Sequence, residues 1–347
     1  MSRAVRAIVF TAPGEIALRD FALPEPEAGH LVVETIYSTV SPGTELRGLA
    51  GTKESQDRFP IVPGYAVVGR VIEVGAAVRG WSVGELVAAS GGEERFPGHA
   101  RLWGGHASLH RYLPEDVVKL PADADPWAYV FTELIAITHR GIAATGAAAG
   151  ESAAVVGQGM VGALAARWLM HAGVRVSVTD LVPARLERAR GWGAYATIEG
   201  RLDDARERLR ATLGVGADIV VEASASIAGA QLARTLVRPG LMRLAHATFR
   251  PDLARSAAIW PRLLYLATYT ATMAITPSGA EDTEGALVLT TCDRSREDRD
   301  AAVAAIARGW FATADFLAAP TPASDAPAAY RRLRDRPAEV TALSFTW

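Results

Sequence analysis

A glycine-rich stretch, VVGQGMVGALAARWLMHAG from Val155 to Gly173, could do chemistry by holding a cofactor. In the pattern G-x-G-x-x-G the first glycine permits a sharp strand-to-helix turn, the second lets the backbone approach a pyrophosphate, and the third lets helix and sheet pack closely. The pyrophosphate lies on the free N–H groups and the positive dipole end of the following helix. The residues that match the pattern are Gly157, Gln158, Gly159, Met160, Val161 and Gly162. The alternative is a tight turn into an ordinary buried helix.

The flanking residues favour the cofactor. Residues 152–156 form a short apolar run typical of a buried parallel strand, and a second run, 174–179, ends at Asp180. An acidic side chain there accepts hydrogen bonds from the ribose hydroxyls of NAD and repels the 2′-phosphate of NADP. Asp180 could instead cap the next helix, and Arg185 lies close enough to weaken the preference. We therefore predict a dinucleotide pocket that favours NAD(H) over NADP(H), with Asp180 and Arg185 among its residues.

The elements that must position this loop alternate along the chain. A third apolar run at 217–223 is followed by a helix to Leu236 and a further strand at 241–245. Strand and helix in alternation predict an α/β unit with a doubly wound parallel sheet over residues 131–290. Residues 1–130 contain short strands between glycine and proline turns, typical of a β-barrel, and residues 291–347 end in a strand expected to rejoin them.

The composition of the chain limits the classes of function that it could have. With 347 residues, 21% charged side chains and a net charge of −2, the chain gives no electrostatic case for binding nucleic acid or membranes. The single cysteine, Cys292, excludes an internal disulfide and a cysteine-based structural zinc site. The N-terminus leads directly into a strand, and the apolar run 263–274 is too short to span a bilayer. We expect a cytoplasmic protein acting on a small molecule.

The whole chain resembles the medium-chain dehydrogenase/reductase superfamily, in which a GroES-like β-barrel catalytic domain accompanies a Rossmann domain. The segments that carry the resemblance, besides the glycine loop, are SPGTEL (41–46), PGYAVVGRVIEVG (63–75), GGHASLHRYLP (104–114), ADIVVEASAS (217–226) and the tail YRRLRDRPAEVTALSFTW (330–347). SPGTE, PGY and the tail are most similar to the bacteriochlorophyllide hydroxyethyl dehydrogenase branch. The resemblance implies an NAD(P)-dependent oxidoreductase acting on an alcohol or ketone.

The chain departs from the zinc alcohol dehydrogenases of this superfamily at their metal ligands. Those enzymes have a cysteine where this chain has Ser41 or Pro42, and Gly-His-Glu where it has Gly64-Tyr65-Ala66. The four-cysteine lobe is missing, and a catalytic zinc needs about three protein ligands on one ion. His106 and His110 are expected on one strand, too far apart to share an ion. We therefore expect no zinc.

Without a metal, hydroxyl or acid–base groups must hold the substrate oxygen and relay a proton. The resemblance points to Tyr65, Thr44, His106 and Glu133. Tyr65 takes the place of the zinc-ligand histidine, Thr44 matches a proton-passing hydroxyl, and Glu133 lies near a carboxylate of the polyol dehydrogenases. His106 resembles a histidine at the rim of the cleft in zinc-free relatives. Three of them have a structural alternative: aromatic packing for Tyr65, a turn for Thr44, and a surface or packing position for His106.

Other residues are expected at the cofactor or in the framework. Thr138 is expected to open the first helix of the Rossmann domain and touch the nicotinamide ribose, as in relatives. Ser224 and Ser226 follow a strand at the edge where cofactors bind, although both could be helix caps. Glu45 is expected to bond backbone amides or Arg70. Framework roles are also favoured for His110 and His139, whereas His99 lies in a glycine-rich loop, residues 91–105, that could close over a substrate. Trp103 and Phe96 of the same loop could stack on a planar ligand, but capping the core is favoured for both.

Three classes of function remain open. The first is a zinc-independent NAD(H)-dependent oxidoreductase interconverting a secondary alcohol and a ketone, on a sugar-like, tetrapyrrole or natural-product substrate. The second is an NADPH-dependent quinone or enoyl reductase. Asp180 makes this class less favoured, because its carboxylate would repel the 2′-phosphate of NADPH. The third is a non-catalytic cofactor-binding protein, for which an intact glycine pattern would be unnecessary. The resemblance also implies a homodimer joined through the Rossmann sheet edge, expected at 266–275.

Overall fold

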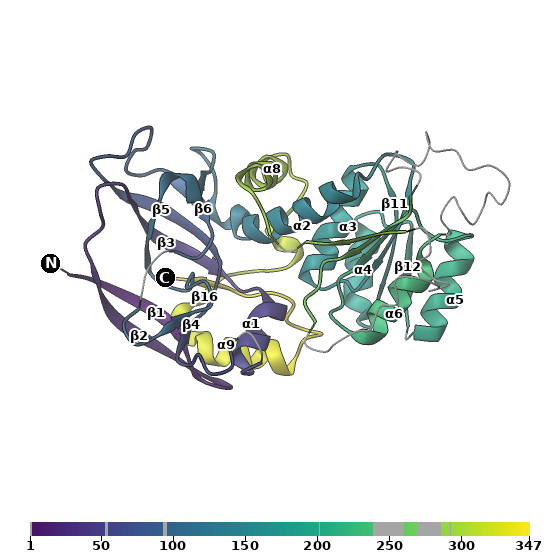
Figure 1. Ribbon diagram of the computed structural model, residues 1–347, viewed down its shortest axis with the longest axis horizontal. Coiled ribbons are helices and arrows are strands. Elements are labelled where there is room, and N and C mark those ends of the chain that lie inside the picture. The colour runs from purple at the N-terminus through teal and green to yellow at the C-terminus, as the bar shows by residue number, and fades with distance from the viewer. Residues whose placement is uncertain are drawn as a thin grey trace. The chain divides into compact units, whose positions relative to one another are not determined.

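The computed structural model describes residues 2–52, 55–92, 96–200, 202–238, 260–269, 286–291 and 293–347. The chain divides into two units (Figure 1). Unit 1 comprises Met1–Ala136 and Ser295–Trp347, and unit 2 comprises Ile137–Arg294. The terminal segment therefore returns to the N-terminal unit, as the tail of the sequence predicts. No helix of the described residues is both long and apolar enough to cross a membrane.

The described strands of unit 1 form two sheets. The smaller has the strand order β2-β1-β4-β7, and the larger has the order β16-β17-β3-β5-β6-β9, with β8 also paired to β3. The strands are β1 (Ser2–Ala12), β2 (Glu15–Pro24), β3 (Leu31–Thr39), β4 (Ile61–Val62), β5 (Ala66–Val74), β6 (Leu86–Ala89), β7 (Ala100–Arg101), β8 (Leu109–Tyr112), β9 (Val117–Lys119), β16 (Thr321–Pro322) and β17 (Ser344–Thr346).

The C-terminal strand β17 is the link between the tail and the barrel. It pairs antiparallel with β3, with Phe345 opposite Ser38. The helices of unit 1 are α1 (Pro42–Leu49), α8 (Arg296–Ala307) and α9 (Ala326–Asp335), and α2 (Thr132–Thr145) begins there. α1 and α9 contact each other, and α9 also contacts β2 (Figure 1). The apolar cluster between these helices and β1 includes Phe10, Tyr330, Leu333 and Phe345.

Unit 2 is a parallel sheet with helices packed on it. Its strand order is β12-β11-β10-β13-β14-β15, so the order reverses between β10 and β13 as in doubly wound folds. The strands are β10 (Ser152–Val156), β11 (Arg175–Asp180), β12 (Ala196–Glu199), β13 (Ile219–Glu222), β14 (Arg262–Tyr265) and β15 (Leu287–Thr290). Besides the second half of α2, the helices among the described residues of unit 2 are α3 (Met160–His171), α4 (Pro183–Gly191), α5 (Leu202–Leu213) and α6 (Ile227–Leu236).

Local sequence explains these elements. All five residues of β10 are buried, because strands covered by helices on a parallel sheet meet no water. Pro42 lies in the first turn of α1, where its missing N–H costs nothing. Ser295 and Asp298 form a capping box that begins α8. The α/β architecture expected from the sequence is confirmed.

Several expectations need correction or lie outside the described residues. Thr138 does not open a helix, because α2 begins at Thr132 and places Thr138 in its middle, fully buried. His106 precedes β8 rather than lying on a strand with His110. The strand expected at 241–245 and the cysteine at position 292 lie outside the described residues.

Candidate functional site

The glycine loop between β10 and α3 is closed on its inner side and open at its middle. Gly157 has φ +90°, and a methyl group there would come within 2.8 Å of the Ser224 backbone. A methyl group on Gly162 would lie 1.9 Å from the Gly157 carbonyl oxygen, so the helix can approach the strand only without a side chain there. At Gly159 a methyl group would meet no atom within 4 Å. The loop therefore leaves room above its second glycine.

Side chains from β11 and α4 hold the peptide groups of Gln158. Its N–H donates to Asp180 Oδ2 at 2.6 Å, and its carbonyl accepts from Arg188 Nη2 at 2.9 Å. Asp180 Oδ1 accepts from the Val182 N–H at 2.9 Å, while Arg185 Nη1 lies 3.5 Å from Oδ2. The N-cap of α4 is Val182, so Asp180 is not the helix cap that it could have been. Asp180 thus joins the loop to the second strand.

These residues fit a dinucleotide. The open space at Gly159 adjoins the N-terminus of α3, where Gly159 is the N-cap and the first N–H groups have no helical acceptor. The loop lies at the carboxyl end of β10, beside the point where the strand order reverses. In open α/β sheets this is where ligands bind. A carboxylate at Asp180 completes the usual set of a phosphate cradle and a ribose acceptor.

The end of β13 carries a buried acidic group that the sequence interpretation missed. Glu222 is fully buried, and its Oε1 accepts from the Ser224 N–H at 2.8 Å and from the Ser224 hydroxyl. The phenol of Tyr269 donates to the other oxygen, Oε2. Ser226, and not Ser224, caps α6 by accepting from the Gly229 N–H at 2.9 Å. Glu222 thereby fixes the turn that packs against Gly157.

We expect Glu222 to give the fold a dependence on pH. Burial raises the pKa of its carboxyl above the ordinary value near 4.5, although hydrogen bonds from Ser224 and Tyr269 act in the opposite direction. A group whose pKa folding raises stabilises the fold below its unfolded pKa, and the contribution is lost as the pH rises through the folded value.

The free energy of unfolding of the wild type should therefore fall relative to that of Glu222→Gln, which cannot ionise, from about pH 4 upward. Urea denaturation of both proteins at a series of pH values measures this difference. A difference independent of pH would show that the glutamate does not ionise differently in the two states.

In unit 1 the strand register brings two of the candidate residues, Thr44 and Tyr65, to one end of the larger sheet. Thr39 at the end of β3 pairs with Ala66 at the start of β5. The residues that follow β3, including Ser41 and Thr44, therefore lie at the same edge as Tyr65. The Ser41 hydroxyl donates to Thr44 Oγ1 at 3.4 Å, and Thr44 is half-buried in the first turn of α1.

Tyr65 is nearly buried, and its ring meets that of Trp103 at 5.3 Å, edge to face. The aromatic packing considered as an alternative for Tyr65 is therefore present. Trp103 itself is 43% exposed, whereas Phe96 is buried among core residues, as its framework interpretation requires.

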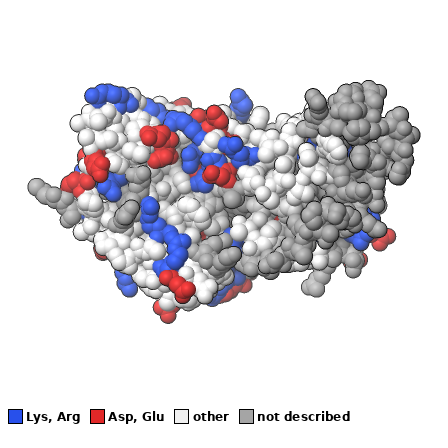
Figure 2. All heavy atoms as spheres, viewed as in Figure 1, with Lys and Arg blue, Asp and Glu red and all other residues white. Residues whose placement is uncertain are grey.

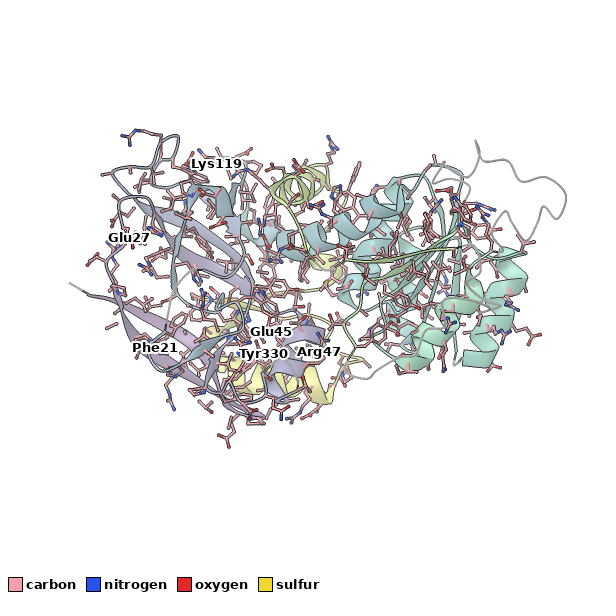
Figure 3. The ribbon with its side chains drawn as sticks, viewed as in Figure 1. Phe21, Glu27, Glu45, Arg47, Lys119 and Tyr330 are labelled. Carbon is pink, nitrogen blue, oxygen red and sulfur yellow. The ribbon has the colours of Figure 1, made fainter. Side chains whose placement is uncertain are left out.

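His106 is not at a rim: it is fully buried behind this edge, with both ring nitrogens hydrogen-bonded. Nδ1 lies 2.8 Å from Ser38 Oγ, and Nε2 lies 2.9 Å from Glu45 Oε2. Glu45 also accepts from the Ser41 N–H at 2.9 Å and from the Tyr330 phenol, and Figure 3 shows Glu45 and Tyr330 side by side. A histidine enclosed in this way cannot touch a substrate, so its expected position is corrected.

Glu45 bonds a backbone amide as expected, but not Arg70, which donates to the Gly84 carbonyl instead. Burial and the adjacent Glu45 raise the pKa of the Tyr330 phenol well above its ordinary value of 10. Tyr330 therefore stays a neutral donor. The indole of Trp347 closes the network by donating to Ser38 Oγ at 2.8 Å.

Glu133 lies in the first turn of α2 and is almost completely buried. Its Oε1 accepts from Arg299 Nε of α8 at 2.7 Å. The remaining histidines take framework positions. His110 Nε2 lies 3.2 Å from the Gly105 carbonyl, His139 packs on Trp168, and His99 packs on Phe21.

The groups near Tyr65 do not fit a catalytic zinc. Ser41 and Tyr65 offer neutral hydroxyls where thiolate and imidazole would be needed. The two possible ligands behind them, His106 and Glu45, are hydrogen-bonded to each other. Within the described part of the chain, no three His, Cys, Asp or Glu side chains gather closely enough to hold a metal ion.

Known proteins resemble the chain along most of its length. Residues 27–122 match the alcohol dehydrogenase GroES-like domain. The chain is 30% identical to a probable alcohol dehydrogenase of Mycobacterium tuberculosis (strain CDC 1551 / Oshkosh), over 68% of this chain and 73% of that protein. It is 27% identical to a sorbitol dehydrogenase of Halalkalibacterium halodurans, over 67% of this chain and 74% of that protein.

Three solved structures share the fold. An alcohol dehydrogenase from Thermus sp. ATN1 has a TM-score of 0.81 at 22% identity, over 99% of both chains. An Escherichia coli alcohol dehydrogenase complexed with NADH has 0.81 at 17% identity, also over 99% of both chains. A putative zinc-binding dehydrogenase from Sinorhizobium meliloti bound to NADP has 0.78 at 19% identity, over 99% of this chain and 100% of that one.

The chain belongs to the medium-chain dehydrogenase/reductase superfamily. It is therefore an enzyme of the oxidoreductase class, built from a GroES-like unit and a Rossmann unit.

Proposed function

We propose that the protein is a zinc-independent, NAD(H)-dependent oxidoreductase that interconverts a secondary alcohol and a ketone. The observation that carries the proposal is the loop at Gly157–Gly162, which leaves open space at Gly159 and is tied to the carboxylate of Asp180. The similarity to proteins named as alcohol and sorbitol dehydrogenases supports an alcohol substrate. Sugar-like, tetrapyrrole and natural-product alcohols all fit this class.

A bound nicotinamide would supply the hydride acceptor. The protein must hold the substrate oxygen and move one proton. We assign Tyr65 and Thr44 as the hydroxyl groups that hold this oxygen, since the register of β3 and β5 brings both segments to one edge. Ser41, which donates to Thr44, extends the path for the proton. Glu133 is assigned a positioning role through its bond to Arg299.

The proposal of zinc independence rests on the chemistry of the residues. Hydroxyl groups at Ser41 and Tyr65 are poor ligands for zinc, and Glu45 and His106 already satisfy each other. A similar protein is named as zinc-binding, so metal content is a decisive measurement. Elemental analysis of the purified protein should give far less than one zinc per chain, and oxidation of 1-phenylethanol by NAD⁺ should survive dialysis against a chelator. One zinc per chain, with activity lost on chelation, would contradict the proposal.

An NADPH-dependent quinone or enoyl reductase is the second candidate, and one observation favours it. Arg185 and Arg188 both reach the neighbourhood of Asp180 and Gln158. Two guanidinium groups there could attract a 2′-phosphate. The carboxylate of Asp180 opposes this, since a phosphate beside it would meet like charge.

Asp180→Asn separates the two candidates. The amide keeps an oxygen to accept from Gln158 but loses the negative charge, so we expect the ratio of NADH to NADPH affinity to fall by at least about tenfold. Arg185→Gln should raise the same ratio, because it removes a positive charge from the same place. Titration calorimetry with both nucleotides measures the ratio. If Asp180→Asn leaves it unchanged, Asp180 does not select the cofactor.

We also propose a homodimer. The edge expected at 266–275 lies partly outside the described residues, and Leu266 itself is buried. Among the described strands the sheet ends at β15, whose Leu287 and Val288 are 42% and 48% exposed. Apolar edge strands of this kind pair with a partner. Sedimentation should give twice the mass of 36.7 kDa, and Val288→Lys should give the monomer.

A further inference from the structure

A surface cavity of unit 1 lies beside Tyr65 and is used by none of the roles assigned so far. Its volume is about 540 Å³, within the range of small-molecule sites. Its lining is Arg58, Gly91, Gly92, Ala100, Arg101, Leu102 and Trp103. The segments that form it run side by side, since β4 and β7 pair in parallel and the Leu102 N–H donates to the Val62 carbonyl at 2.9 Å.

Trp103 has an unusual conformation for a large side chain. Its φ is +68°, a region that a bulky residue rarely enters without a reason. Such a conformation persists where the surrounding structure imposes it, and it often marks a binding site. Its carbonyl packs so closely on Gly91 that a methyl group there would lie 2.0 Å away. The strained backbone holds the indole 43% exposed, with its ring against that of Tyr65.

Arg101 supplies a fixed positive charge. Its Nη1 donates to the Gly92 carbonyl at 2.5 Å, which aims the guanidinium. Arg101 forms no ion pair with any residue in the described ranges. The Arg101 carbonyl in turn accepts from Arg58 Nη2 at 2.7 Å, which brings a second guanidinium to the same wall. Unit 1 carries both basic and acidic side chains on the face shown in Figure 2.

We propose that this cavity binds the distal part of the substrate, and that the substrate is a planar ring compound carrying an oxyanion, either a carboxylate or a phosphate. The exposed indole supplies a face for the ring. Guanidinium groups bind carboxylate and phosphate through paired N–H donors. The contact between Trp103 and Tyr65 places this end of the substrate next to the hydroxyl assigned to its oxygen. This proposal rests on the proposed function in one respect, namely that the oxygen held by Tyr65 is the alcohol or ketone oxygen that reacts.

Matched substrates test the charge. We expect 4-(1-hydroxyethyl)benzoate to be oxidised with a kcat/KM about 10- to 100-fold above that of 1-phenylethanol, as a charge-assisted hydrogen bond would give. The corresponding aryl phosphate distinguishes a phosphate from a carboxylate preference. Arg101→Gln should abolish most of the preference, and Arg101→Lys should restore part of it. The matched control is Arg70→Gln, because Arg70 also donates to a glycine carbonyl but lies outside the cavity.

Trp103→Gly tests the ring. Glycine relieves the positive φ, so this variant should be at least as stable as the wild type while its KM for both aromatic alcohols rises about two- to tenfold. A loss of stability with unchanged KM would show that Trp103 serves the fold, and would overturn its role as a binding platform.

Binding without turnover separates this inference from the proposed reaction. Calorimetry should show that the ketone 4-acetylbenzoate binds more tightly than acetophenone, and that Arg101→Gln removes the difference. If the ketone binds in this way but no alcohol is oxidised, the proposed function fails and the anionic subsite stands. If 1-phenylethanol is oxidised and a carboxylate gives no advantage in rate or binding, the subsite is wrong and the proposed function stands. No binding of 4-acetylbenzoate at millimolar concentration would also overturn it.

Discussion

Replacing Glu45 with alanine is expected to destabilise the protein by about 3–5 kcal/mol. The carboxylate accepts from the Ser41 N–H, the Tyr330 phenol and the ring of His106. All of these groups are buried, and water cannot replace the missing acceptor. A buried donor left without a partner costs about 1–3 kcal/mol. For a domain of this size the melting temperature should fall by about 10 °C.

Urea denaturation followed by circular dichroism measures the effect of Glu45→Ala, with Tyr330→Phe as the matched variant. Phenylalanine keeps the ring packed against Phe10 and Phe345 and removes only one hydrogen bond to the carboxylate. Its cost should be about 1–2 kcal/mol. If the alanine variant costs no more than the phenylalanine variant, Glu45 is not the acceptor that holds α1, α9 and the segment before β8 together.

Replacing Gly159 with alanine is expected to weaken NADH binding about 10- to 100-fold without unfolding the protein. The methyl group would meet no protein atom within 4 Å, and Gly159 already has φ −62°, which alanine adopts easily. The methyl group would instead occupy the space proposed for the pyrophosphate, and forcing an extra methyl into a filled site costs about 1–3 kcal/mol.

Gly162→Ala is the contrasting variant. Its methyl group would lie 1.9 Å from the Gly157 carbonyl oxygen, so α3 and the loop would have to separate. We expect a lower melting temperature, with loss of NADH binding as a consequence. Thermal melts and NADH titrations of both variants distinguish the two cases. If the space at Gly159 serves the ligand, Gly159→Ala loses binding at an unchanged melting temperature, whereas Gly162→Ala melts at a lower temperature. Wild-type NADH affinity in Gly159→Ala would place the cofactor elsewhere.

The framework of unit 2 could be predicted from local pattern. The apolar run 152–156 is β10 with the same bounds, and Asp180 is the last residue of β11. These signals are local because a parallel strand is apolar throughout. Gly157 and Gly162 are also local signals, because a side chain at either position would clash with nearby backbone atoms.

The position of His106 could not be predicted in this way. Its partner Glu45, and Tyr330 that donates to Glu45, are far from it in the sequence. No helical or strand periodicity in the sequence links these three residues. The same is true of Glu133 and Arg299. A histidine three residues before a strand looks the same in the sequence whether it faces solvent or a buried carboxylate.

The sequence interpretation missed Glu222 and favoured a core cap for Trp103, and the reason differs from that for His106. Glu222 stands at the end of an apolar strand, which is a visible signal for a buried carboxylate, but its donors Ser224 and Tyr269 come from a turn and a distant segment. The positive φ of Trp103 is a backbone property that cannot be predicted from the presence of a tryptophan. The glycines that follow it, Gly104 and Gly105, are a hint in the sequence that the chain turns tightly there.

The most direct test of the account is the affinity of the purified wild-type protein for NADH and for NADPH, measured by calorimetry beside the Gly159→Ala variant. We expect NADH to bind the wild type at least about tenfold more tightly than NADPH does, since the proposal puts the carboxylate of Asp180 beside the ribose, where it would oppose a 2′-phosphate. We also expect Gly159→Ala to lose this binding while keeping its melting temperature. A preference for NADPH would remove the role of Asp180 and favour the reductase, and the absence of binding by either nucleotide would contradict the account.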